Sequence, residues 1–363
     1  MINFANPKSE YLKNKNKIHK VIKKVLSSNS YILGKSVKDF ERKFSNYNNS
    51  KYALGVSSGT DAIIIALKTL NVKPGDEIIT TSHTAYATIA AIVEIGARPV
   101  FIDIEYDNFN MKYDEIENKI SKKTKGIILV HIYGIVANVQ MVKKICLKNK
   151  IFLIEDCAQA HGASLKNKKV GTFGDFGTFS FYPTKNLSTF GDAGALITNQ
   201  KKNFQKAKLL REYGWVKRNI GVLKSINRRM DEIHAAILLV QLKNLDKNNK
   251  KRIKIANYYS KNIKNNKIIL PKLDKKNLHV FHLYVIKVKH NLRKKLIHYL
   301  NKNKINPGIH YILPNHEQKP FKNYKKSKLI NTKKISPEIL SLPIYPELKI
   351  EDVKKITNLL NNF

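Results

Sequence analysis

Between residues 51 and about 200, seven short apolar runs alternate with segments of helical periodicity, and this pattern limits the possible folds more than any other feature. Helix-like stretches such as DAIIIALKTL and YATIAAIVEIG lie between several of the runs. The seven runs are KYALGV, DEIITT, RPVFIDI, KGIILVHI, KIFLIED, GTFSFY and GALITN. Strands that alternate with helices at this spacing predict an α/β fold with a mostly parallel sheet and helices on both faces.

The segments on either side of this alternation predict two smaller parts. Residues 1–30 are predicted to be an N-terminal helical segment, because IHKVIKKVLSS has helical spacing. The chain becomes rich in Lys and Asn near residues 246–252, and its last hundred residues contain a strand-like HVFHLYVIKV and a helix-like RKKLIHYLNKN. We therefore expect a large domain over 31–245 and a smaller C-terminal α+β domain over 246–363.

The charge of the chain suggests a nucleic-acid partner, but the kind of basic residue argues against it. With 67 Lys and Arg against 27 Asp and Glu, the formal net charge is +40. A strongly basic chain is a first indication of nucleic-acid binding. However, only eight of these residues are arginine, the residue that dominates phosphate and base recognition. We expect no nucleic-acid partner. We interpret the lysines as solvent-exposed surface residues whose number reflects the codon bias of an AT-rich genome. The alternative is that their positive electrostatic field attracts an anionic substrate.

Three further features predict a soluble cytoplasmic protein without a metal site. The first residues, MINFANPKSEYLKNKNK, contain no apolar core of a secretory signal. Apolar runs such as IIIAL fall far short of the roughly 18 residues of a membrane-spanning helix. The two cysteines, Cys146 and Cys157, have the spacing of neither a disulfide framework nor a metal motif.

The ends of three predicted strands carry the residues of chemical interest, since ligands of open α/β sheets bind beyond the carboxyl ends of the strands. The first is VSSGTDA (56–62), where a turn of small residues opens an apolar helix. Backbone N–H groups at such a helix start favour an anion. The alternative is that Ser, Thr and Asp here only cap the helix.

The second strand end is FLIEDCAQAHG (152–162), which places two carboxylates directly after an apolar run. A buried carboxylate is costly without a cationic or protonated partner, so Asp156 predicts a positive group nearby. The alternative is that one carboxylate caps the next helix and that His161 is structural.

The third strand end is TFSFYPTKNL (178–187), where Lys185 lies in a turn after an apolar strand. A partly desolvated lysine loses its proton more readily and can act as an amine nucleophile. Pyridoxal 5′-phosphate (PLP) needs such a lysine for its aldehyde, a carboxylate for its pyridine nitrogen and a phosphate cup. The order of the three segments fits the fold-type I aminotransferases.

Nearly end to end, the sequence resembles the DegT/StrS-type nucleotide-sugar aminotransferases. The resemblance implies the PLP-dependent transferase fold of type I, with a seven-stranded sheet in the large domain, and a homodimer with active sites at the subunit interface. The matching segments are YILGKSVKDFE (31–41), SSGTDA (57–62), PGDEIITTSHTAYAT (74–88), EDCAQAHGA (155–163), SFYPTKNL (180–187), GDAGALIT (191–198), NRRMDEIHAAIL (227–238), HYILPNHEQ (310–318) and LPIYP (342–346).

The resemblance also implies roles for individual residues toward the cofactor. Lys185 would bind the cofactor aldehyde and move protons, Asp156 would pair with the pyridine nitrogen, and Gln159 would contact the ring or its 3-oxygen. The phosphate would be held by Gly59, Thr60 and Ser180, and by Asn227 of the neighbouring subunit.

Toward the substrate, the resemblance implies that Arg229 binds an anionic group and that His310 and Tyr311 lie beside the sugar pocket. The sequence departs from the family pattern in two places. Ala85 stands where many members carry an aromatic ring that stacks on the cofactor, which leaves Tyr86 as the candidate for stacking. Near Asn227, Ser225 replaces a common glycine and Arg228 replaces a frequent serine.

The implied reaction transfers an amino group, expected to come from L-glutamate, to a keto group of a nucleotide-linked sugar. The segments LLREYGWVKRN and SHTAYAT resemble members that act on dTDP-3-keto-6-deoxyhexoses and give 3-amino-3,6-dideoxy sugars for lipopolysaccharide or another surface glycan. The alternative is amination at C4 of a UDP-, dTDP- or GDP-4-keto-6-deoxy sugar. Lys185 argues against the related sugar dehydratases, which carry histidine there. A non-catalytic regulatory relative would be expected to lack Lys185 or Asp156.

Overall fold

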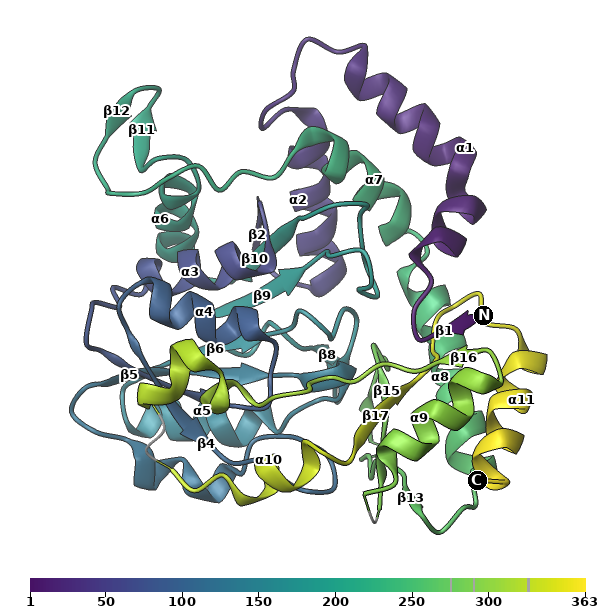
Figure 1. Ribbon diagram of the computed structural model, residues 1–363. Coiled ribbons are helices and arrows are strands. Elements are labelled where there is room, and N and C mark those ends of the chain that lie inside the picture. The colour runs from purple at the N-terminus through teal and green to yellow at the C-terminus, as the bar shows by residue number, and fades with distance from the viewer. Residues whose placement is uncertain (275, 290, 325–326) are drawn as a thin grey trace.

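A central seven-stranded sheet dominates the computed structural model, which describes residues 1–274, 276–289, 291–324 and 327–363 (Figure 1). All seven predicted strands form, and their order in the sheet is β2-β10-β9-β6-β5-β3-β4. Only β10 runs antiparallel to its neighbours, and the other pairs are parallel. The strands are β2 (Tyr52–Val56), β3 (Glu77–Thr81), β4 (Arg98–Ile102), β5 (Thr124–Val130), β6 (Phe152–Asp156), β9 (Phe176–Ser180) and β10 (Gly194–Thr198). The predicted α/β fold class is therefore confirmed.

Helices cover both faces of this sheet because its apolar residues point alternately to either side. One face, with Leu54, Ile128 and Leu196, packs against α3 (Gly59–Thr69), α4 (Tyr86–Glu94) and α6 (Lys201–Arg211). On the other face, the part with Phe179 and Ile197 packs against α2 (Lys35–Asn48) and α7 (Glu232–Leu242). The remainder of that face packs against α5 (Val139–Lys148). The first helix, α1 (Pro7–Leu26), lies against α7.

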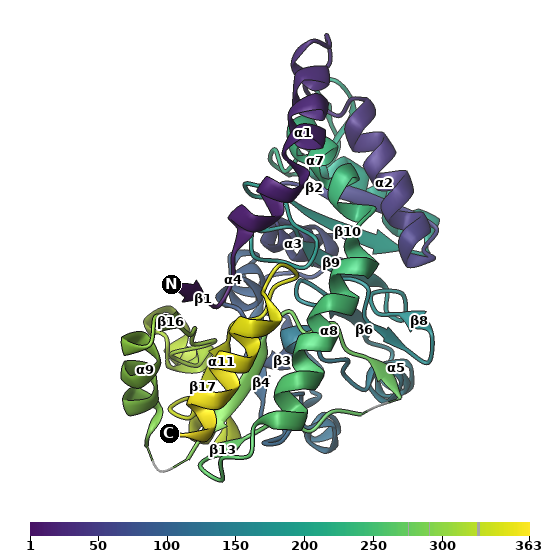
Figure 2. The same cartoon turned by 90° about the vertical axis from the view of Figure 1, so that its right-hand side faces the viewer.

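The C-terminal part forms its own layer beside the large sheet (Figure 2). Its three-stranded sheet joins β13 (Ile268–Ile269), β15 (Tyr284–Val288) and β17 (Ile339–Leu342). The sheet packs against α8 (Leu245–Asn262), α9 (Arg293–Lys302) and α11 (Ile350–Asn361). The N-terminal strand β1 (Ile2–Asn3) pairs in parallel with β16 (Ile305–Asn306), so both chain termini lie at this part. The domain boundaries at residues 30 and 245 stay predictions.

The strand predicted over 279–288 begins only at Tyr284. Upstream of it, the N–H groups of Val280 and Leu283 donate to the carbonyls of Gly134 and Tyr133, at 3.0 and 3.3 Å. Residues 279–283 therefore follow the loop after β5 instead of joining a sheet.

The remaining elements are short, and the hairpin β11–β12 projects from the body beyond α6 (Figure 1). They are β7 (Ser164–Leu165), β8 (Lys168–Lys169), β11 (Trp215–Lys217), β12 (Ile220–Gly221), β14 (Asn277–Leu278), α10 (Ile330–Ile335) and the 3-10 helices Tyr113–Glu115, Glu117–Lys119, Ile132–Gly134, Asn315–Glu317 and Lys319–Tyr324. Within the described residues, none of the helices combines the length and apolarity that crossing a membrane requires.

Candidate active site

The N-terminus of α3 lies directly against the end of β9, which brings Gly59, Thr60 and Ser180 together. A Cβ on Gly59 would lie only 2.6 Å from the Cβ of Ser180, so this approach requires glycine. Ser58 caps the helix, and its Oγ accepts the N–H of Asp61 at 3.0 Å. Among the described residues, the N–H groups of Gly59 and Thr60 have no protein acceptor. Unbonded N–H groups at the start of a helix suit an anion such as a phosphate.

Asp156 ends β6 with only 4% of its surface exposed. The hydroxyl of Thr88 donates to its Oδ2 at 2.8 Å, and the N–H of Ala158 donates to its Oδ1 at 3.1 Å. Burial raises the pKa of Asp156, and these two hydrogen bonds and the charge of Lys185 partly oppose that rise. Because a buried carboxylate is stabilised by a cationic partner, Asp156 fits a protonated ring nitrogen.

Lys185 lies in the turn after β9, where its N–H donates to the carbonyl of Tyr182 at 2.9 Å. Burial lowers the pKa of Lys185 to about 8, although the charge of Asp156 acts in the opposite direction. Lys185 in turn helps burial to lower the pKa of His310 to about 4, so this histidine is neutral near pH 7. The structure therefore combines an amine that deprotonates readily with a buried carboxylate whose charge acts on it.

Gln159, His310 and Tyr311 are joined by hydrogen bonds through Tyr133. The N–H of Tyr133 donates to Gln159 Oε1 at 2.6 Å, and Gln159 Nε2 donates to the Tyr311 hydroxyl at 2.7 Å. The Tyr133 hydroxyl donates to the carbonyl of His310. Burial raises the pKa of Tyr311 well above its usual range, so its hydroxyl stays protonated. These bonds hold the loop that carries His310 and Tyr311 against the ends of the large sheet's strands.

Three predicted site residues do not join this group within a single chain. Asn227 is exposed, and its Oδ1 accepts the N–H of Arg229 at 3.2 Å. Arg229 pairs with Glu212 at 2.9 Å and lines a separate hollow of about 950 Å³. Tyr86 is 47% exposed, and its ring centroid lies 4.8 Å from that of Phe321. Their roles stay predictions.

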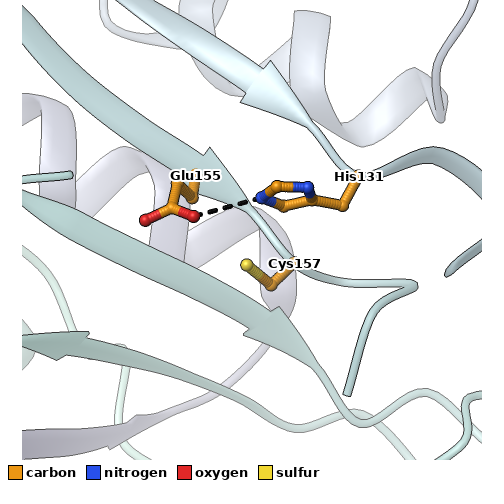
Figure 3. A group of neighbouring side chains, drawn as sticks. All are labelled: His131, Glu155 and Cys157. Carbon is orange, nitrogen blue, oxygen red and sulfur yellow. Dashed lines mark hydrogen bonds and ion pairs between the residues drawn. The ribbon is translucent and has the colours of Figure 1, made fainter. Parts of the chain in front are cut away.

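A second buried cluster joins Glu155 and Cys157, the chain neighbours of Asp156, to His131, a grouping that the sequence did not indicate. Potential metal-binding atoms of His131, Glu155 and Cys157 all lie within 4.8 Å of one another (Figure 3). His131 Nδ1 accepts the N–H of Ala137 at 3.1 Å. That nitrogen is therefore unprotonated, and the opposite Nε2–H donates to Glu155 Oε2 at 3.1 Å.

Glu155 uses its remaining acceptor capacity on the loop that leads into β9. Its Oε1 accepts the N–H groups of Phe173 and Gly174 at 2.7 and 2.9 Å, and its Oε2 accepts that of Gly171 at 2.8 Å. With four donors bound, this carboxylate is an anchor for residues 171–174 rather than a free metal ligand.

Thr88 is the contact of Asp156 that sequence reasoning missed. It belongs to the SHTAYAT segment, and its Oγ1 also lies 3.2 Å from the Oγ1 of Thr84. Helical periodicity indicated that Thr88 lies in the first turn of a helix, but no sequence signal linked it to a carboxylate 68 residues away.

Known proteins share both the sequence and the fold of this chain. The model of the DegT/DnrJ/EryC1/StrS aminotransferase family matches residues 13–361. A dTDP-3-amino-3,6-dideoxy-alpha-D-galactopyranose transaminase of Aneurinibacillus thermoaerophilus is 39% identical over 363 residues, covering 100% of this chain and 99% of that protein. A pleiotropic regulatory protein of Geobacillus stearothermophilus is 37% identical and covers 98% and 97%.

The solved structure of S. venezuelae DesV superimposes with a TM-score of 0.96 at 31% identity, over 99% of this chain and 98% of that one. The resemblance inferred from the sequence motifs is confirmed, and with it the aminotransferase class and the PLP cofactor. The chain belongs to the DegT/DnrJ/EryC1/StrS aminotransferase family.

Proposed function

We infer that this PLP-dependent aminotransferase aminates C3 of a dTDP-3-keto-6-deoxyhexose and yields the 3-amino-3,6-dideoxy sugar. The proximity of Lys185 and Asp156 carries the aminotransferase chemistry, because it pairs a readily deprotonated amine with a buried carboxylate. The choice of sugar is supported by the 39% identity, over the whole chain, to a transaminase named for a dTDP-3-amino-3,6-dideoxy sugar.

The residues present fit the cofactor. When bound, PLP supplies an aldehyde and an electron-accepting ring. The N–H groups of Gly59 and Thr60, with the Ser180 hydroxyl, would hold its phosphate. Asp156 would keep the proton on the ring nitrogen, since burial makes a cationic partner favourable.

Lys185 has two tasks in this proposal. Its amine would hold the cofactor aldehyde between turnovers, and once displaced by an amino donor it would move a proton at the substrate carbon. A pKa of about 8 suits both tasks, because the neutral and protonated forms of Lys185 are then close in free energy near neutral pH.

We further propose that two copies of the chain form a homodimer that shares its active sites. Support comes from apolar side chains in and after the projecting hairpin, next to Asn227. Val216, Ile220, Val222 and Ile226 are 58%, 53%, 57% and 57% exposed. Apolar surface of this kind favours a protein partner. L-Glutamate as donor, a cytoplasmic location and a role in surface-glycan synthesis remain predictions from the resemblance.

The test is transfer of labelled nitrogen. The purified protein is loaded with PLP and incubated with ¹⁵N-glutamate and a panel of dTDP- and UDP-linked 3-keto and 4-keto sugars, and the products are analysed by mass spectrometry. We expect ¹⁵N at C3 of a dTDP-linked product and none with the K185A variant. Label at C4 would refute the proposed position. A protein that takes up the amino group of glutamate but labels no sugar would refute the proposed substrate class.

A further inference from the structure

The first turn of α3 contains a negative charge beside the expected phosphate site. The Oδ2 of Asp61 accepts the hydroxyls of Ser57 and Ser58, at 2.5 and 3.2 Å. A carboxylate at a helix N-terminus is stabilised by the helix dipole. However, the same carboxylate would repel a phosphate held by the N–H groups of Gly59 and Thr60, unless a cation neutralises it.

Arg228 is that cation in this chain. Its Nη1 donates to Asp61 Oδ1 in an ion pair whose side chains are only 10% and 19% exposed. The backbone of Arg228 is fixed on both sides: its carbonyl accepts the N–H of Ser57 at 3.0 Å, and its own N–H donates to Arg211 O at 3.0 Å. The pairing of this segment with the end of β2 therefore fixes the backbone of Arg228, and the ion pair with Asp61 holds its guanidinium.

The Arg228 guanidinium retains donor capacity at this position. Its Nε–H is buried and has no hydrogen-bond partner within the described part of the chain. The charge of Arg228 also reaches Lys68, which lies on α3 like Asp61. Burial and the charge of Arg228 together lower the pKa of Lys68.

We propose that Arg228 is the charge-compensating residue of the phosphate cup: by neutralising Asp61 it keeps the N-terminus of α3 positive enough to bind the cofactor phosphate. This inference rests on the proposed cofactor site and adds a residue to which neither the motifs nor the comparisons assign a role. Arg228 acts through Asp61 and is therefore a positioning residue.

The test is a double-mutant cycle in which the dissociation constant of the cofactor is measured, not the turnover rate. Apoprotein of the wild type, R228M, D61N and D61N/R228M is titrated with PLP and, separately, with pyridoxal, which lacks the phosphate. We expect R228M to weaken PLP binding at least about tenfold, because it leaves the Asp61 charge uncompensated, and to leave pyridoxal binding unchanged. D61N should bind PLP more tightly than the wild type, and the double variant should recover most of the loss.

Two outcomes would overturn the inference: R228M binding PLP as tightly as the wild type, or R228M losing affinity for PLP and pyridoxal equally, as a general structural effect would cause. If R228M does not fold, D61N decides, because unchanged or weaker PLP binding by D61N contradicts the compensation. R228K keeps the charge and is the matched control. A wild type that binds neither PLP nor pyridoxal would instead refute the cofactor site itself.

Discussion

The Glu155 anchor leads to a sharp prediction about stability. In E155Q the side chain keeps its shape, but an NH₂ group replaces one of the two oxygens. At the Oε1 position the NH₂ would face the N–H groups of Phe173 and Gly174, and at the Oε2 position it would face Gly171 N–H and His131 Nε2–H. In either orientation two hydrogen bonds are lost, and the new NH₂ group faces two N–H donors that it cannot accept.

The size of the effect follows from these contacts. A buried donor without an acceptor costs about 1–3 kcal/mol, and two such donors are left in either orientation. Breaking a buried charged interaction from one side costs about 3–5 kcal/mol. Because Glu155 is fully buried, water cannot replace the lost oxygen. We therefore expect E155Q to lower the free energy of unfolding by about 4 kcal/mol.

The assay is urea unfolding followed by circular dichroism, with E117Q as the matched control. Glu117 is 49% exposed and pairs with Lys148 at 2.8 Å, so the same chemical change there should cost no more than about 1 kcal/mol. If the unfolding midpoint of E155Q equalled that of E117Q, Glu155 would not be the anchor of residues 171–174.

Three further predictions concern the pH dependence of stability, the phosphate site at Gly59 and the carboxylate of Asp156. Burial raises the pKa of Glu10 to about 7, so the folded state binds this proton more tightly than the unfolded state. The resulting stability is complete below the ordinary pKa of about 4.5 and is lost as pH rises through 7. Urea midpoints should therefore fall more steeply between pH 5 and 8 for the wild type than for E10Q, and parallel slopes would contradict this. G59A should weaken PLP binding because the new Cβ would lie 2.6 Å from that of Ser180, and an unchanged dissociation constant would contradict the cup. T88V should shift the pH at which the absorbance of bound cofactor changes, because Asp156 loses a donor, whereas T88S should behave like the wild type.

The sequence alone determined the strands of the large sheet and the positions of Lys185 and Asp156 relative to those strands. Apolar runs of strand length, separated by helical periodicity, are local signals, and all seven strands appear where these signals lie. The position of Lys185 in a turn after β9, and that of Asp156 at the end of β6, could be inferred in the same way. Their joint role in binding the cofactor is a prediction from the order of the motifs along the chain and from the resemblance to the family.

What only the tertiary structure decided is the partner of each polar group. Period-two alternation required Glu155 and Asp156 to point to opposite faces of the sheet, but not which of them would meet Lys185. The donors that settle this, Thr88 for one carboxylate and residues 171–174 for the other, are distant in sequence and approach only when the strands pair. Likewise, the sequence showed Arg228 only as one of two departures from the motif around Asn227, and the fold places it against Asp61. A hydrogen bond or ion pair depends on atoms brought within about 3 Å, and the spacing of residues along a chain does not set that distance.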